Sequence, residues 1–122
     1  MTTATTWRKE RGRETERLLA AYWRERGWPY AEPVGAGRQG ADITGMPGLA
    51  VEVKATRACQ PMAWLRQANG RGVLEEGLSV LPLVVWRPDG MGEAHLREWP
   101  ALTNVLFMTR LLRAAGYGDG ED

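Results

Sequence analysis

Apolar residues recur along this chain at helical spacing in some stretches and at strand spacing in others. In the first stretch, Leu18, Leu19 and Tyr22 repeat at the interval of a helix, and Gly27 provides its end. The whole pattern predicts seven elements. They are a helix at 8–26, a short extended segment at 28–34, a β-hairpin at 40–54, a helix at 61–69, a strand at 82–86, a short edge strand at 93–97 and a last helix at 99–115.

The last predicted helix is apolar on more than one face. Pro100 suits its first position and Gly116 its end. Val105, Leu106 and Leu112 lie between them. A terminal helix with this pattern either closes the core or pairs with a second chain, and the sequence leaves both open.

The hairpin carries the polar side chains around which the chain is organised. Asp42 lies on its first arm, and Glu52 and Lys54 lie on its second, with a Gly/Pro turn between the arms. Because side chains alternate along a strand, Glu52 and Lys54 leave one face while Val51 and Val53 leave the other. Two carboxylates and one ammonium are therefore expected at one edge of the hairpin.

This cluster indicates a metal site. Neighbouring carboxylates repel one another, and a half-buried ammonium loses its hydration. A divalent cation resolves the conflict, since Asp42 and Glu52 offer hard oxygen ligands suited to Mg²⁺, with Mn²⁺ as a substitute, and the backbone carbonyl of Val53 can provide another. Lys54 can then hold or deprotonate the water that attacks a phosphodiester.

The size of the chain limits its architecture. Its 122 residues suffice for one core, not for separate recognition and catalytic domains. The predicted fold is a single α/β (α+β) domain over residues 1–122, a central mixed β-sheet flanked by helices in the order α-β-β-α-β-(β)-α. Residues 1–6 and 117–122 are expected to be disordered tails.

Composition predicts a cytoplasmic protein. No run approaches the ~20 apolar residues of a membrane span, and the N-terminal residues lack a secretory apolar segment. The single cysteine, Cys59, excludes an internal disulfide and a cysteine-rich zinc site. His95, the only histidine, is interpreted as structural, because no cysteine cluster or second histidine accompanies it.

Charge is distributed unevenly along the chain. The formal net charge is +1, yet residues 1–72 carry 12 Lys+Arg against 7 Asp+Glu, whereas residues 73–122 carry 4 against 8. The half that contains Asp42 and Glu52 is therefore the basic half. Metal bound at these carboxylates would make it more positive still, as a phosphate-binding surface requires.

These motifs resemble those of a known nuclease superfamily. The pattern of Asp42, nine intervening residues and then Glu52, Val53 and Lys54 resembles the PD-(D/E)XK signature. The G-x-x-x-E-R segment at 12–17 resembles the first helix of archaeal and phage Holliday junction resolvases. Residues 63–68 and 83–87 show weaker similarity to small phage resolvases.

The resemblance implies a restriction-endonuclease-like fold and a metal-dependent DNA endonuclease. Its substrate would be the four-way junction of DNA recombination and repair, cut symmetrically to leave a 5′-phosphate and a 3′-hydroxyl. Asp42, Glu52 and Lys54 would be catalytic, and Glu16 would complete the metal site, directly or through water. Two symmetric cuts imply a homodimer, acting in the host cytoplasm if the source is viral.

Several polar side chains are candidate DNA contacts, and for some the sequence leaves a structural alternative. The candidates are Arg13, Arg17, Arg38, Arg57, Gln67, Arg71 and Arg87. Arg38 lies in a glycine-rich loop four residues before Asp42, where it can clamp a phosphate. Arg87 suits a salt bridge equally well, Gln67 suits a solvated surface, and Glu16 suits pairing with nearby arginines.

Two other functions fit the same sequence. One keeps the site but changes the substrate to duplex or flap DNA, as in restriction-like or repair nucleases. The other is a non-catalytic DNA-binding or assembly module in which Glu52 and Lys54 lie on a surface hairpin. Among the six tryptophans, Trp7 is expected to be exposed, and core packing is expected for most of the others.

Overall fold

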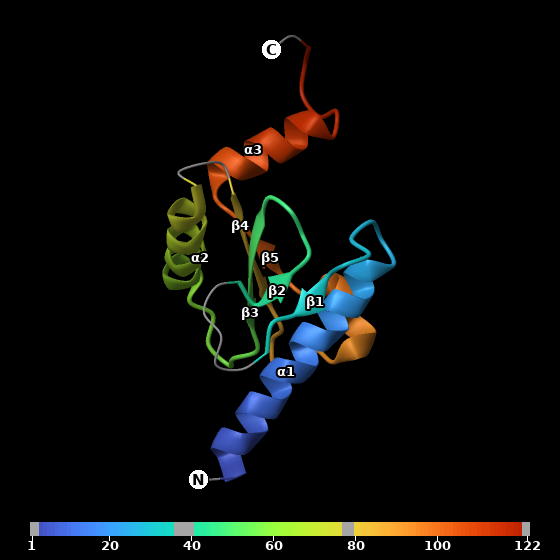
Figure 1. Cartoon of the computed structure of the whole chain (residues 1–122), viewed down its shortest axis with the longest axis vertical. Helices are drawn as coiled ribbons and strands as arrows, with labels where there is room; N and C mark the ends of the chain where they lie inside the picture. Colours follow the sequence, from blue (N-terminus) through green and yellow to red (C-terminus); the bar gives the residue numbers. More distant parts are fainter. Residues whose placement is uncertain (1–2, 36–40, 77–79, 121–122) are drawn as a thin grey trace.

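The predicted elements form in the predicted order. The computed structural model describes residues 3–35, 41–76 and 80–120, with side chains described at 6–35, 41–68 and 80–120. In chain order the elements are helix α1 (Thr3–Arg24), strands β1 (Glu32–Pro33), β2 (Ile43–Thr44) and β3 (Leu49–Lys54), helix α2 (Pro61–Glu76), strand β4 (Leu81–Trp86), the 3₁₀ helix η1 (Glu93–Glu98), strand β5 (Ala101–Leu102) and helix α3 (Val105–Ala114) (Figure 1).

One mixed sheet of five strands forms the centre of the domain. Its strands lie in the order β1-β2-β3-β4-β5. β3 and β4 are parallel, with α2 as the crossover between them, and the other neighbouring pairs are antiparallel. The predicted fold class, a small α+β domain with a mixed sheet flanked by helices, is confirmed. β1 forms within the predicted extended segment and adds one strand to the predicted order.

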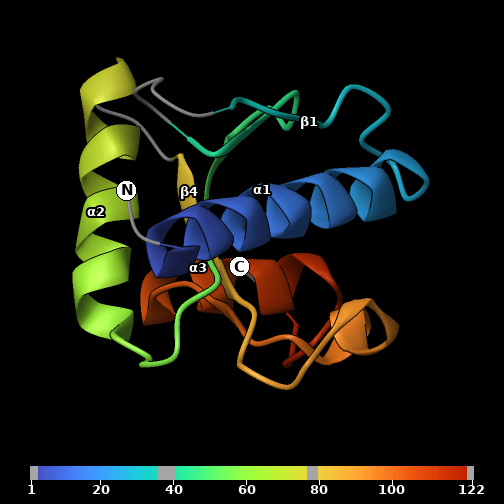
Figure 2. The ribbon, with the colours of Figure 1, turned by 90° about the horizontal axis from the view of Figure 1, so that it is seen from below.

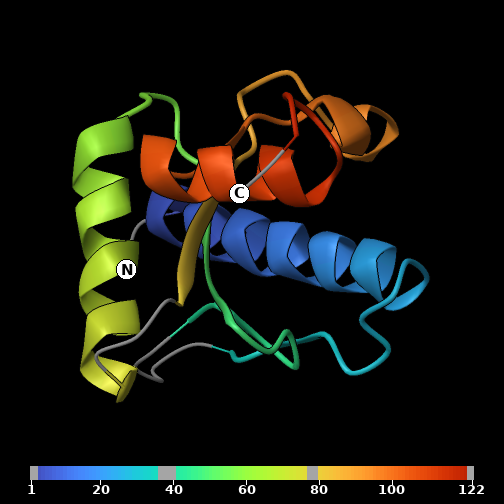
Figure 3. The same cartoon turned by 90° about the horizontal axis from the view of Figure 1, so that it is seen from above.

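The two long helices cover opposite faces of the sheet. Along β4, Val85 packs in one apolar cluster with Leu19 of α1, whereas its neighbour Val84 packs in a second cluster with Trp64 and Ala68 of α2. Successive side chains of a strand point to opposite faces, so these clusters mark two sides of the sheet. Figures 2 and 3 show α2 to one side of β4 and α1 running past the other side.

α1 and α2 each extend beyond the prediction at one end. α1 begins at Thr3, so residues 3–6 are helical instead of forming a disordered tail, and it ends at Arg24, before the predicted 26. α2 continues past its predicted end at 69 to Glu76 and contains Gly70 and Gly72, the glycines expected to stop it. One glycine in a helix costs about 1 kcal/mol, which neighbouring helical hydrogen bonds can offset. No helix among the described residues is long and apolar enough to cross a membrane.

The region after β4 differs most from its prediction. Residues 93–97 form the 3₁₀ helix η1 instead of an edge strand, and β5 at 101–102 takes the edge position. The last helix begins at Val105, because Pro100 is used by the sheet: its carbonyl accepts from Trp86 N at 3.0 Å. Asn104 caps the helix by accepting from Phe107 N at 2.9 Å.

α3 does not close the core. None of its residues is buried, and apolar side chains along it are exposed, namely Val105, Leu106, Met108, Leu111 and Leu112. The core-closing alternative is therefore wrong. The chain after it also differs from expectation, since Arg113 donates to the carbonyls of Asp119 (2.6 Å) and Gly120 (3.2 Å).

The turn between β2 and β3 depends on two glycines with positive φ. Gly45 (φ +78°) and Gly48 (φ +80°) both adopt the left-handed region that favours glycine. They differ in their surroundings. A Cβ on Gly45 would collide with the backbone carbonyl of Tyr30, whereas a Cβ on Gly48 would have open space around it. Gly45 therefore lets the turn pack closely against the segment before β1.

This difference predicts unequal effects of two matched substitutions. Gly48→Ala should lower the free energy of unfolding by about 1–2 kcal/mol, the cost of left-handed backbone for alanine. Gly45→Ala adds a backbone collision and should cost roughly 3 kcal/mol or more. Urea denaturation of the two variants measures the difference. Equal losses would show that the close contact with Tyr30 does not constrain the turn.

Candidate active site

Asp42 is fixed where the β2–β3 ladder ends. The ladder pairs Ile43 with Val51, and Asp42 comes directly before this pair in the chain. The backbone N–H of Asp42 donates to the carbonyl of Val51 at 2.8 Å. In return, one carboxylate oxygen of Asp42 accepts from the N–H of Val53 at 2.8 Å. This side chain thus takes the place of a backbone acceptor and is held at the sheet edge.

Glu52 and Lys54 share the face of β3 that α2 covers. In the parallel ladder Glu52 pairs with Val84 and Lys54 with Trp86, and both partners belong to the α2 cluster. Glu52 is 1% exposed. Lys54 is partly exposed and donates from Nζ to the side-chain oxygen of Gln67 on α2 at 3.0 Å. The expected alternation is confirmed, and Gln67 lies against the predicted site.

The backbone carbonyl of Val53 points to the β2 side of β3, the side on which Asp42 lies. The Lys54 carbonyl accepts from Arg87 N on the β4 side, whereas the Val51 carbonyl accepts from Asp42 N on the β2 side. Carbonyls alternate along a strand, so that of Val53 is directed to the β2 side. Carboxylate oxygens of Asp42 and Glu52 and this carbonyl form a donor set of the hard oxygen type that fits Mg²⁺ or Mn²⁺.

Glu16 lies close enough to this edge for its titration to respond to Asp42. Burial and, to a smaller extent, the charge of Asp42 raise the pKa of the Glu16 carboxyl to about 7, against the opposing charges of Arg13 and Arg17. However, no group of three or more acidic, histidine or cysteine side chains in the described part of the chain is arranged to hold a metal ion. Glu16, Asp42 and Glu52 therefore do not form a preassembled three-carboxylate cluster.

A cleft runs from the site to the N-terminal half of α1. Its volume is about 510 Å³. Val53, Lys54 and Arg57 line it from β3 and the segment that follows, and Trp7 and Arg8 line it from α1. Arg8 and Arg57 are exposed and add two cations beside Lys54, although Arg57 Nε lies 3.8 Å from Asp89 Oδ2, an acidic group that also lines the cleft. This surface suits a polyanion.

The predicted DNA contacts fall into three groups. Arg13 and Arg17 are exposed on α1, and the Arg57 side chain is 94% exposed at the cleft. Arg38 lies outside the described residues, as does the side chain of Arg71. The salt-bridge alternative holds for Arg87, whose side chain is 11% exposed and donates to Glu14 Oε1 at 3.0 Å and to Thr15 Oγ1 at 3.1 Å.

Sequence reasoning missed the role of Arg11. Its guanidinium donates to the carbonyl of Ala55 (3.2 Å), to Asp89 Oδ1 (2.9 Å) and to the carbonyl of Pro88 (3.0 Å). These contacts join α1 to the segments that leave β3 and β4. Nothing in the sequence separates Arg11 from the other arginines of the helix, because its partners are mostly backbone carbonyls distant in sequence.

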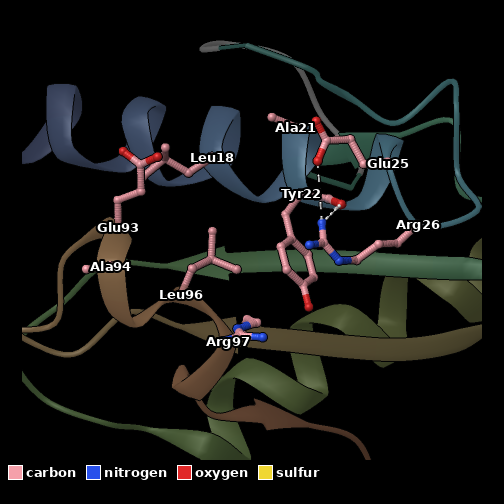
Figure 4. A pocket seen from close by; sticks show the side chains of 9 residues that line it. All are labelled: Leu18, Ala21, Tyr22, Glu25, Arg26, Glu93, Ala94, Leu96 and Arg97. Carbon is pink, nitrogen blue, oxygen red and sulfur yellow. Dashed lines mark hydrogen bonds and ion pairs between the residues drawn. The ribbon is translucent and has the colours of Figure 1, made fainter.

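A second hollow, of about 370 Å³, lies between the C-terminal half of α1 and η1 (Figure 4). Of the two arginines that line it, Arg26 is engaged by the last turn of α1. Arg26 donates to the carbonyl of Tyr22 at 2.8 Å, and its guanidinium carbon lies 3.8 Å from the centre of the Tyr22 ring. Leu18 and Leu96 line it from the two helices. This hollow is a packing seam that shares no lining residue with the cleft.

The raised pKa of Glu16 predicts a pH-dependent effect of Glu16→Gln. Between pH 4.5 and 7 the folded protein keeps a proton on Glu16 that the unfolded chain releases, so the contribution of this carboxyl to stability is lost as pH rises. Relative to the wild type, Glu16→Gln should be more stable at pH 8 than at pH 5, by on the order of 1 kcal/mol after solvent screening. Urea denaturation in metal-free buffer at both pH values measures this. A wild-type advantage that grows with pH would contradict it.

The chain matches no protein-family model, no curated protein and no solved structure. The functional interpretation therefore depends on the geometry of the site.

Proposed function

We propose that this chain is a metal-dependent DNA endonuclease of the PD-(D/E)XK type that resolves four-way junctions by symmetric phosphodiester hydrolysis. One arrangement supports the proposal: Asp42 is anchored on the N–H of Val53, the residue between buried Glu52 and Lys54, and these last two share one face of β3. The element order, with a parallel β3–β4 pair joined by α2, is compatible with that superfamily.

Asp42, Glu52 and the Val53 carbonyl would hold the cation. When bound, Mg²⁺ polarises the phosphodiester and favours ionisation of a coordinated water. The residues of the chain would orient the ligands around the cation. Asp42 is already oriented by the Val53 N–H through one oxygen, which leaves the other oxygen for the metal. Glu16, partly buried beside them, would act through water.

Lys54 would orient or activate the attacking water. Its ammonium has three N–H donors, and one of them is engaged by Gln67. The remaining donors can hold water or a phosphate oxygen beside the metal ligands. Gln67 would thus position the amine, since its hydrogen bond restrains a long and flexible side chain.

Exposed arginines would bind the DNA backbone. Arg13, Arg17 and Arg57 present their charges to solvent near the site, whereas Arg87 is engaged inside the protein. Phosphate contacts position a duplex without reading its bases, so junction shape would determine the substrate. Affinity should fall steeply as salt concentration rises.

A homodimer would supply the second cut, and α3 is its proposed interface. Val105, Met108 and Leu112 recur at intervals of three and four residues and are 82%, 41% and 44% exposed. They therefore form one apolar stripe. Figure 1 shows α3 at the end of the molecule opposite the N-terminal turns of α1. Pairing two copies there would leave both clefts open to DNA.

Cleavage of a labelled four-way junction tests the proposed activity. The wild type should cut it in Mg²⁺ and not in EDTA, whereas Asp42→Asn and Lys54→Ala should each lower the cleavage rate by at least 100-fold. Asp42→Asn retains an oxygen acceptor for Val53 N–H, so its fold and its junction affinity should persist. Gel cleavage and binding assays on the same DNA report both properties.

A linear duplex of the same sequence is the matched substrate. A junction resolvase should cut it far more slowly than the junction. Equal rates would indicate a nuclease of duplex DNA with the same site. If wild type and variants alike leave every substrate intact in Mg²⁺, the endonuclease proposal fails.

The dimer proposal predicts the effect of a charge placed on the α3 stripe. Met108→Glu should raise the dimer dissociation constant at least tenfold, because a buried carboxylate is costly at an apolar interface. Arg110→Glu, on the opposite side of the helix, is the matched control and should leave the dimer intact. Light scattering coupled to size exclusion measures both. A monomeric wild type at micromolar concentration would contradict the proposal.

A further inference from the structure

Trp7 stands at the cleft in a position that core packing does not explain. Its side chain is 59% exposed, although a large aromatic surface is normally buried. It lines the 510 Å³ cleft and also borders two other hollows of about 490 and 190 Å³. The indole is therefore open to solvent on more than one side.

The ring nevertheless rests on a fixed support. The guanidinium carbon of Arg11, one helical turn further along α1, lies 5.8 Å from the centre of the Trp7 ring. Arg11 is itself held by Ala55, Pro88 and Asp89. The N-terminal turns of α1 extend past the end of the sheet (Figure 1), and Arg11 fastens this part of the helix to the body of the domain.

The cleft walls suit a nucleic acid strand. Exposed Arg8 on α1 and exposed Arg57 after β3 provide cations, and Lys54 of the proposed catalytic site lies at the same cleft. Oδ2 of Asp89, which also lines the cleft, lies 3.8 Å from Nε of the solvent-exposed Arg57 side chain, so Arg8 and Lys54 carry most of the unpaired positive charge. On the α1 wall, Gly12 leaves open space, since a Cβ there would meet nothing within 4 Å. A glycine inside a helix is unfavourable, but the absence of a side chain at Gly12 lets a sugar-phosphate backbone approach the helix closely.

We propose that this cleft binds an unpaired stretch of DNA, with Trp7 stacking on a displaced base and Arg8 and Arg57 contacting phosphates. Base stacking on an exposed aromatic side chain requires a base that has left its duplex partner. A continuous duplex offers no such base, whereas branched or single-stranded DNA does. The inference deepens the proposed nuclease function, because it states how the same cleft would favour unpaired substrates.

Binding of a labelled oligo-dT strand and a duplex of equal length tests this inference. Trp7→Ala should weaken binding of the single strand at least fivefold and change duplex binding less than twofold, and Trp7→Phe should restore most of the lost affinity. Tyr117→Ala, which removes an aromatic side chain that is 66% exposed and follows α3, is the matched control and should change neither. Fluorescence anisotropy at fixed salt concentration measures all four proteins.

A second variant narrows the cleft from the same α1 wall without altering Trp7. Gly12→Leu should weaken single-strand binding without lowering the melting temperature, because the added side chain enters open space on a helix. Unchanged single-strand affinity in Trp7→Ala, or equal losses for single strand and duplex, would overturn the inference. These outcomes are distinct from failure of the nuclease proposal, which would appear as absent cleavage by the wild type whatever the effect of Trp7.

Discussion

The hydrogen bond between the Val53 N–H and the Asp42 carboxylate is the constraint on which the site depends. It forms where the β2–β3 ladder ends, so a side chain completes the pairing that the backbone no longer provides. The bond fixes the rotamer of Asp42 and keeps β3 extended for one more residue. On the other side of β3, the parallel ladder with β4 holds Glu52 and Lys54 on the α2 face.

The arginines of α1 and β4 separate into structural and solvated groups, and this separation shapes the charged surface. Arg11 and Arg87 are each 11% exposed and tie α1 to the ends of β3 and β4. Buried guanidinium groups need several acceptors, and carbonyls at strand ends provide them. Arg8 and Arg57 remain exposed at the cleft. The positive electrostatic potential near Lys54 therefore arises from fewer arginines than the sequence contains in this region.

The sequence predicts the hairpin and its polar face correctly because these follow from local rules. Alternation along a strand places Glu52 and Lys54 on one face, and Gly45 and Gly48 mark the turn that brings Asp42 to the Val53 N–H. Tertiary contacts decide what the sequence could not. The Pro100 carbonyl is taken by Trp86, which moves the start of the last helix to Val105. The sequence left Arg87 open between a phosphate contact and a salt bridge, and Glu14, a residue 73 positions earlier, decides for the salt bridge. No local sequence pattern predicts either of these two long-range contacts.

The energetic cost of the site indicates that stability alone does not explain it. Glu52 is buried at a position whose neighbour in the ladder is Val84, and burying a carboxylate costs free energy that its partners must offset. A raised pKa at Glu16 shows that negative charge is already disfavoured there. A domain of this size has a net stability of only about 5–15 kcal/mol. The cation of the proposed function would offset this cost, since a bound divalent ion attracts every carboxylate that it contacts.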